Sequence, residues 1–388
     1  MYYKHINQIH IEVTDRCNAE CPACPRSHGG GQVMPYVKNQ ELGLKYFHLL
    51  GKDFISKIRK WNFCGTKGDP ASAQELFEIL DYILDCNPET EIDIRTNGGA
   101  RNTKFWQRVG ERFKPTNGRA RVVWSIDGWG DTNEVYRRNV KWDKLYANLM
   151  TYIKTGAQSK WEFSHFAHNE KDVEIVENFC ARYQIELFVR EPFGFESINS
   201  EDGYKSKFKS MPVYKKVEDI DNKTDSFLEY TIKPFGIAEE DLNHDHNDYY
   251  SLKTWKPGFY DTNQWTHLKN AEVKIDCMVS NDIRHEIFID SNGMILPCCF
   301  TASKYIMGDE QLVKMYGPYE KELTVTETNS IYDVLDHKVF RKTMPDAMSG
   351  KLDDEVGYCV TCVQHCKNRD QVISHPDQHM GVGQMNPD

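Results

Sequence analysis

The sequence predicts an α/β fold: a series of strand–helix units that form a parallel sheet, followed by a smaller cysteine-rich α+β domain. Short runs of strand-forming residues recur along the first half of the 388-residue chain, and most end in turns rich in Gly, Asn or Asp. Segments between them place apolar residues three and four positions apart, as amphipathic helices do. Cysteines gather at two places, near residue 20 and after residue 276. Alternating strands and helices are typical of parallel sheets with right-handed crossovers.

Six strands are expected, at residues 9–14, 58–63, 92–95, 122–126, 161–166 and 187–189. Six strand–helix units make an incomplete barrel, so we predict a partial (β/α)6 TIM-type barrel. Ser72 and Glu75 have the spacing of a capping box, which predicts that a helix begins there. Asn169 is expected to cap the helix after the fifth strand.

The extent of this strand–helix pattern sets the expected domain boundaries. Residues 1–198 form the barrel core, and residues 199–270, rich in Lys and acids, form a linker or insertion placed to cover the active site. Residues 271–376 form the cysteine-rich domain, and residues 377–388 a loose tail.

Composition narrows the class of protein. A formal charge of −10 argues against general binding to nucleic acid or anionic membranes. The mean hydropathy is −0.65, and no apolar run reaches the ~18 residues of a membrane span. The first residues lack the apolar segment of a signal peptide, so we expect a cytoplasmic protein. In that compartment, twelve cysteines indicate metal ligands or reduced thiols.

The first cysteine group, Cys17, Cys21 and Cys24, has the spacing C-x3-C-x2-C and directly follows the first expected strand. Three thiolates leave a [4Fe–4S] cluster one ligand short, so one iron stays open for a substrate or cofactor. The alternative is a zinc knuckle with a distant fourth ligand.

This motif resembles the signature of the radical S-adenosylmethionine (radical SAM) superfamily. The resemblance implies that S-adenosylmethionine occupies the open iron and yields a 5′-deoxyadenosyl radical, which abstracts hydrogen from a substrate. It also assigns cofactor-binding roles to residues at the ends of the expected strands. These are Gly65, Gly68 and Asp69 for the methionine amino group, Thr96 and Asn97 in the third-strand turn, Ser125, Asp127 and Arg137 near the ribose and carboxylate, and Phe166 and His168 near adenine. Arg138 is the adjacent alternative to Arg137, and Ala23 replaces an aromatic residue common in the family.

The second cysteine group resembles the SPASM and twitch auxiliary-cluster domains of the same superfamily. A hairpin over residues 286–296 is expected to bring Cys298 back toward Cys277, and Cys359 and Cys362 complete four thiolates for one auxiliary [4Fe–4S] cluster. Cys366 is a reserve ligand, and structural zinc is the alternative metal. Among the remaining cysteines, Cys299 is expected to pack beside the site and the rest to lie in the core; these are Cys64, Cys86 and Cys180.

The resemblance therefore implies an enzyme with two [4Fe–4S] clusters and S-adenosylmethionine. The expected reaction is oxidation or modification of a peptide or small polar molecule, with an electron donor such as flavodoxin or ferredoxin. No catalytic acid or base is identified from the sequence. The alternative function is an iron–sulfur or zinc binding module that does not cleave the cofactor.

Overall fold

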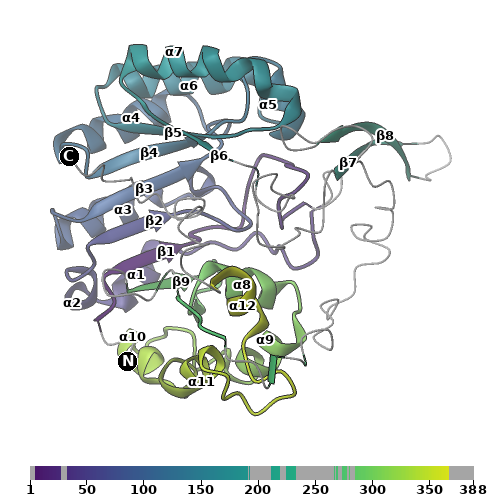
Figure 1. The fold of residues 1–388 in the computed structure, drawn as a ribbon. Helices are drawn as coiled ribbons and strands as arrows, with labels where there is room; N and C mark the ends of the chain where they lie inside the picture. The colour runs from purple at the N-terminus through teal and green to yellow at the C-terminus, as the bar shows by residue number, and fades with distance from the viewer. Residues whose placement is uncertain are drawn as a thin grey trace.

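In the computed structural model, the described residues are 5–27, 33–190, 192, 211–218, 224–232, 266, 268–269, 273–277, 279 and 285–366. Eight strands form one open sheet in the order β10–β9–β1–β2–β3–β4–β5–β6 (Figure 1). Their bounds are β1 Gln8–Ile11, β2 Lys60–Phe63, β3 Glu91–Thr96, β4 Ala120–Ser125, β5 Ser159–Ser164, β6 Glu186–Arg190, β9 Glu286–Ile289 and β10 Ile295–Leu296. Neighbouring strands are parallel except β9 and β10. The predicted partial barrel is confirmed, and each of the six expected strands is present.

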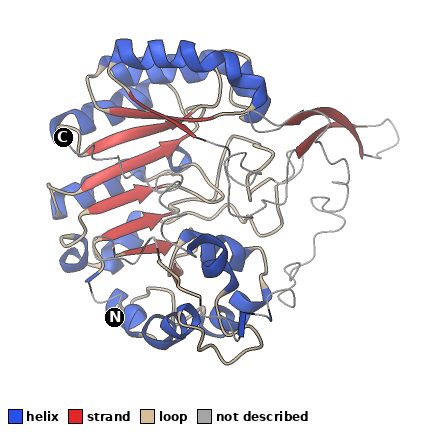
Figure 2. Cartoon of the chain, viewed as in Figure 1, coloured by secondary structure: helices blue, strands red, loops and turns tan. Residues whose placement is uncertain are grey.

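Helices cover one face of the sheet and surround its β9 edge (Figure 2). In the barrel core they are α1 Leu44–Leu50, α2 Lys52–Ile55, α3 Leu76–Cys86, α4 Thr103–Phe113, α5 Thr132–Tyr136, α6 Trp142–Lys154 and α7 Val173–Tyr183. The cysteine-rich module, residues 273–277 and 285–366, adds α8 Cys299–Ile306, α9 Glu310–Tyr316, α10 Ile331–Asp336, α11 Met344–Met348 and α12 Val360–Cys366. No helix of the described residues is long and apolar enough to cross a membrane.

Each barrel strand alternates between an apolar and a charged face. On the helix side, Trp124 of β4 packs on Trp106 of α4, with ring centroids 4.8 Å apart, and Trp161 packs on Phe179 of α7. The other face carries ion pairs between strands, at Lys60–Asp93, Arg121–Asp93, Arg121–Glu186, Lys160–Glu186 and Arg95–Glu162. Buried barrel interiors are normally filled by branched apolar side chains. The concave face of this sheet is instead polar.

The cysteine-rich module is part of the same sheet. The predicted hairpin is present, and its first strand, β9, pairs in parallel with β1 along its whole length. Tyr46 of α1 also donates to the carbonyl of Gly293 at the hairpin turn, at 3.0 Å. A Cβ at Gly293, where φ is +86°, would meet the Tyr46 ring at 2.9 Å. The module therefore extends the sheet beyond β1, on the side opposite β2, by the strands β9 and β10.

Two predicted helix caps are wrong. Helix α3 begins at Leu76, and Ser72 belongs to a separate 3-10 turn, Pro70–Ser72. Glu75 instead accepts the backbone N–H of Leu44, at 2.6 Å, so a tertiary contact replaces the local one. Asn169 lies inside the 3-10 helix Ala167–Asp172, where its side chain accepts from the Phe166 backbone.

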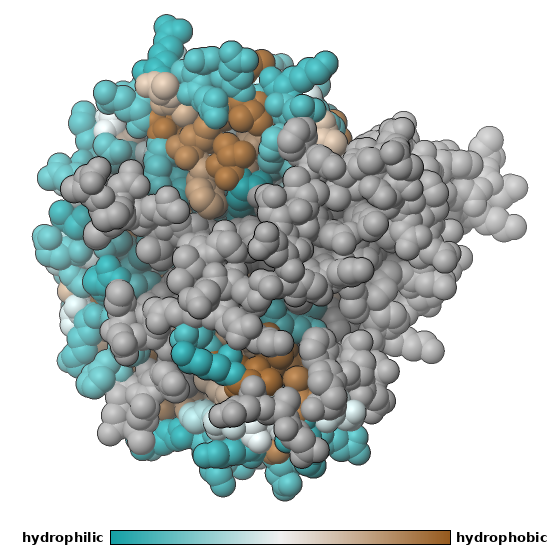
Figure 3. Space-filling model, viewed as in Figure 1, coloured by the Kyte–Doolittle hydropathy of each residue, from teal (hydrophilic) through white to brown (hydrophobic). Residues whose placement is uncertain are grey.

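A separate antiparallel pair, β7 Met211–Glu218 and β8 Thr224–Ile232, falls within the predicted linker 199–270. Apart from these strands and residues 266 and 268–269, that linker lies outside the described residues, as does the predicted tail 377–388. On the face drawn in Figure 3, hydrophobic surface gathers near the edge strand β6 and again near α8 and α9. Val189 of β6 and Val313 of α9 are both exposed.

Ile287→Ala tests whether the module and the barrel form one folding unit. Ile287 is fully buried in β9, opposite Ile9 of β1, so its truncation should lower the free energy of unfolding by about 2–5 kcal/mol. Because the sheet is continuous, denaturant unfolding should remain a single transition. Val313→Ala, at an exposed apolar residue of α9, is the control and should change stability by less than about 0.5 kcal/mol. Two separate transitions, of which only one shifts, would contradict this picture.

Candidate active site

The cysteine loop, residues 14–26, leaves the sheet just beyond the carboxyl end of β1. Burial raises the pKa of the Cys24 thiol to about 12, and Cys21 adds to the rise. Burial also raises the pKa of Cys17, together with nearby Asp69 and Cys21. Backbone N–H groups point at two of the sulfurs: Ala19 at Cys17, 3.3 Å, and Arg26 at Cys24, 3.4 Å. Burial and mutual repulsion thus disfavour three free thiolates here, and a bound cation would compensate their charge.

Two polar side chains from neighbouring strands also reach this loop. Asn97 Nδ2 lies 3.5 Å from Cys17 Sγ, and Arg137 Nη1 lies 3.9 Å from Cys21 Sγ. Donors directed at sulfur are typical of iron–sulfur sites, where they tune the cluster. Arg137 also donates from Nε to Asp127, at 2.6 Å. The guanidinium of Arg137 thus contacts Asp127, a cysteine and the Tyr136 ring, whereas its predicted role is to bind the methionine carboxylate.

Asp69 connects the loop after β2 to the turn after β3. Its Oδ1 accepts the Ala71 N–H at 2.9 Å, and its Oδ2 accepts the Thr96 hydroxyl at 3.0 Å and the Asn97 N–H at 2.8 Å. Burial raises the pKa of Asp69, which those hydrogen bonds oppose. A Cβ at Gly68 would lie 1.8 Å from the Thr14 carbonyl oxygen, so only glycine lets this loop pack on the cysteine loop. Asp69 therefore positions Asn97 beside Cys17.

The residues expected near ribose and adenine end at the same edge of the sheet. Ser125 is the last residue of β4, and buried Asp127 accepts the backbone N–H of Ser164 from β5, at 2.6 Å. The Phe166 and His168 rings stack, with centroids 5.3 Å apart and planes 20° apart. Burial lowers the pKa of His168 to about 4, so the imidazole is neutral at pH 7. Among the described residues, His168 Nε2 has no hydrogen-bond partner.

In the cysteine-rich module, four cysteines line one cavity together with Phe300, His365 and two methionines. They are Cys277, Cys298, Cys362 and Cys366. A hydrogen bond to Cys366 and burial raise the pKa of Cys277, and burial raises that of Cys298 to about 12. Cys359 is fully buried, and a side-chain hydrogen bond with it, together with burial, raises the pKa of Cys362. The reserve ligand Cys366 therefore lies on the cavity wall, whereas the predicted ligand Cys359 does not line the cavity.

The remaining cysteines divide by burial. Cys299 and Cys180 are buried as expected, whereas Cys64 and Cys86, predicted in the core, are partly exposed. Cys64 directly follows β2 and lies near Arg95 and Glu162, on the polar face of the sheet. Within the described part of the chain, no three Cys, His, Asp or Glu side chains are arranged to hold one metal ion.

The cysteine motif thus lies after the first strand of an open parallel sheet, beside a glycine loop that packs on it. The resemblance to radical SAM enzymes stays a prediction from the cysteine motif. No protein-family model matches the sequence. Solved structures with a similar fold include SuiB of Streptococcus suis bound to precursor peptide SuiA, at 11% identity over 87% of this chain and 66% of that chain, with a TM-score of 0.47.

Two further similar structures contain bound S-adenosylmethionine (AdoMet). Native anSMEcpe with bound AdoMet is 13% identical over 92% of this chain and 87% of that chain, with a TM-score of 0.48. BtrN in complex with AdoMet and 2-DOIA is 13% identical over 87% of this chain and 85% of that chain, with a TM-score of 0.38. Such distant similarity by itself assigns no substrate or reaction to this chain.

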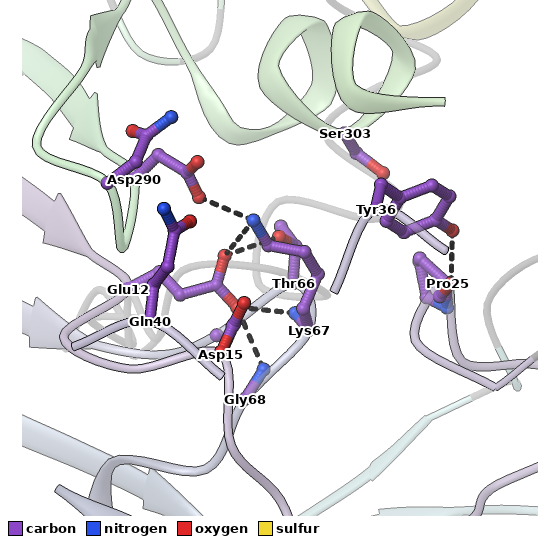
Figure 4. Close-up of polar contacts among 12 residues, drawn as sticks. Glu12, Asp15, Pro25, Tyr36, Gln40, Thr66, Lys67, Gly68, Asp290 and Ser303 are labelled. Carbon is purple, nitrogen blue, oxygen red and sulfur yellow. Dashed lines mark hydrogen bonds and ion pairs between the residues drawn. The ribbon is translucent and has the colours of Figure 1, made fainter. Parts of the chain in front are cut away.

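Sequence reasoning missed two buried charges beside the cysteine motif, Glu12 and Lys67 (Figure 4). Glu12 follows β1 and accepts hydrogen bonds from the backbone N–H groups of Lys67 and Gly68, at 2.5 and 2.8 Å. The Thr66 hydroxyl donates to its second oxygen, at 2.9 Å. The available signal was an acidic residue between two apolar ones, Ile11 and Val13, at the end of the first strand; a buried acid must be compensated by a cation or several N–H groups.

Glu12 should give the protein a measurable pH dependence. Burial raises its pKa from 4.5 to about 7; Lys67 opposes the rise and Asp290 adds to it. A carboxyl group with a higher pKa in the folded state stabilises the fold fully below pH 4.5, and that contribution is lost as pH rises through 7. The free energy of unfolding should therefore fall between pH 5 and 8 by of the order of 1–3 kcal/mol more in the wild type than in Glu12→Gln.

The measurement is denaturant unfolding of both proteins at the two pH values. The other titrating groups are common to both proteins, so the difference isolates Glu12. The charged groups that face it are Lys67 and Asp290, and neither is changed. Parallel pH curves for the two proteins would contradict the prediction.

Proposed function

We propose that the protein is a radical SAM enzyme that reductively cleaves S-adenosylmethionine and abstracts hydrogen from a peptide or small polar substrate. The observation that carries the proposal is a loop with three cysteines at one end of the sheet, with four donors directed at their sulfurs and a glycine loop packed on it. A thiolate set with one ligand missing suits a [4Fe–4S] cluster that binds a cofactor. A donor such as flavodoxin or ferredoxin would supply the electron.

The chain's own residues would hold and orient that cofactor. Cys17, Cys21 and Cys24 are the proposed ligands, and when bound the cluster supplies one-electron cleavage of the sulfonium. Asp69 fixes the backbone of the glycine loop, residues 65–70, against the turn at Asn97. Asp127 holds Arg137 beside the cysteine loop, where its guanidinium adds positive charge near the sulfurs. Ser125, Phe166 and His168 are proposed to line the ribose and adenine side.

For the auxiliary cluster we propose the four cysteines that share the cavity wall. This set consists of Cys277, Cys298, Cys362 and Cys366. Its support is that all four line one cavity, whereas Cys359 does not. Phe300 and His365 stack beside them, with ring centroids 4.3 Å apart, and would limit the access of water. Such a cluster could accept an electron from a substrate radical or orient the substrate.

The polar concave face supports a polar substrate. Arg95 and Asn62 lie on it next to each other and are more than nine-tenths buried. Within the described part of the chain, Arg95 Nη2 and Asn62 Nδ2 have no hydrogen-bond partner. Buried donors of this kind are normally satisfied, so a ligand with acceptor atoms suits them. Peptide carbonyls and small polar molecules both carry such atoms.

Replacing Cys17, Cys21 and Cys24 together by Ala tests the first cluster. After anaerobic reconstitution with iron and sulfide, the variant should hold roughly half the wild-type iron, because the auxiliary ligands remain. With dithionite and S-adenosylmethionine it should form no 5′-deoxyadenosine. Cys86→Ala, at a partly exposed cysteine of α3, is the control and should match the wild type. Unchanged iron in the triple variant, or zinc in place of iron in the wild type, would favour the binding module.

Single substitutions separate the two candidate fourth ligands of the auxiliary site. Cys366→Ala should lose the auxiliary iron yet still cleave S-adenosylmethionine, because it removes a thiol from the cavity wall. Cys359→Ala should keep its iron and lose about 1 kcal/mol of stability, as expected for truncating a buried side chain. Iron analysis, Mössbauer spectroscopy and denaturant unfolding measure these effects. The reverse pattern would restore Cys359 as the ligand.

A further inference from the structure

Three buried charged side chains join the barrel core to the cysteine-rich module. Lys67, in the glycine loop, places Nζ 2.8 Å from Asp290 Oδ1 and 3.6 Å from Glu12 Oε2 (Figure 4). Glu12 is fully buried, and Lys67 and Asp290 are 4% and 3% exposed. Asp290 comes directly after β9, so one end of this cluster belongs to the module. We call these three residues the Lys67 cluster.

The Lys67 cluster fixes the backbone of the glycine loop. Glu12 accepts the N–H groups of Lys67 and Gly68, and the ammonium of Lys67 compensates the charge of that carboxylate. A single ammonium between two carboxylates is attracted to both, and here one of them comes from each part of the molecule. Removing Asp290 would leave Lys67 paired only with Glu12, at the longer of the two distances.

The same loop is in contact with the proposed cluster ligands. Next to Gly68, Asp69 donates its N–H to the Arg16 carbonyl, at 2.8 Å, and accepts from Asn97, whose amide reaches Cys17. The Thr66 carbonyl lies 3.9 Å from Cys24 Sγ. A shift of the glycine loop would therefore move the groups around two of the three sulfurs.

Stability alone is a poor reason for such a cluster. Burying charges is costly, and well-packed apolar side chains usually stabilise a fold as well as a buried ion pair does. Buried charges are more useful for selecting one arrangement among several of similar packing energy, because a misplaced charge loses its partner. The Lys67 cluster has the geometry for that role, since it joins three segments through directional contacts.

We propose that Lys67 and Asp290 are positioning residues through which the cysteine-rich module holds the glycine loop in the shape that binds S-adenosylmethionine. The inference rests on the proposed function and deepens it, because it makes cofactor binding at the amino-terminal site depend on the carboxyl-terminal module. Neither residue touches the reacting atoms; both act through the backbone of residues 66–69.

The test uses reconstituted full-length protein and two readouts. The dissociation constant of S-adenosylmethionine, measured anaerobically by calorimetry, reports cofactor binding, and hydrogen exchange of the Lys67 and Gly68 amides reports the loop itself. Asp290→Asn should weaken binding at least fivefold and speed exchange of those amides. Lys67→Met should weaken it more, because it leaves two buried carboxylates unpaired. In the double variant Lys67→Met/Asp290→Asn, the fold-loss of affinity for S-adenosylmethionine should be smaller than the product of the two single fold-losses, since the two residues act together.

Asp309→Asn is the matched control: Asp309 is a buried aspartate of the same module that caps α9, and asparagine caps a helix equally well. It should leave both readouts unchanged. Asp290→Asn with wild-type affinity and exchange, even at a lower melting temperature, would overturn the proposal and reduce the cluster to a structural contact. If the wild type itself bound no S-adenosylmethionine, the proposed function would fail, and this inference with it.

Discussion

Compensation of buried charge at the carboxyl end of the sheet is the constraint on which the rest of the structure depends. Glu12, Asp69, Asp127 and Asp290 are all nearly inaccessible to solvent, and each receives N–H groups or a cation from a different strand–loop segment. Because an unpaired buried carboxylate is strongly unfavourable, these contacts set the shape of the loops around the cysteines. The loops that would hold a cofactor are thus organised by acids that need not touch it.

The two faces of the sheet differ in composition: the helix side is apolar and the concave side is polar. Large aromatic side chains on the helix side, among them Trp106, Trp124 and Trp161, supply the apolar burial that stabilises the barrel. The concave side carries a network of ion pairs and amides in place of packed apolar side chains. That exchange costs stability and is explicable where a polar molecule must be accommodated.

Strand periodicity and cysteine spacing were enough to predict the partial barrel, the hairpin and the places of both cysteine groups, because these features depend on local pattern. The caps at Ser72 and Asn169 failed because tertiary partners outcompeted the local hydrogen bonds: Glu75 binds the Leu44 backbone, and Asn169 holds a 3-10 turn. The pairing of Lys67 with Asp290 could not be read from the sequence. It joins residues brought together only by the parallel pairing of β9 with β1.

That parallel pairing has a consequence for how the chain folds during synthesis. Gln8 lies opposite Glu286, so one side of β1 stays open until residues 286–289 have been made. Contacts between such distant positions slow folding and prolong the exposure of an unpaired edge. A chaperone that shields β1, or a delay in emergence of the cysteine-rich module, would therefore alter the yield of folded protein more than changes at the later barrel strands.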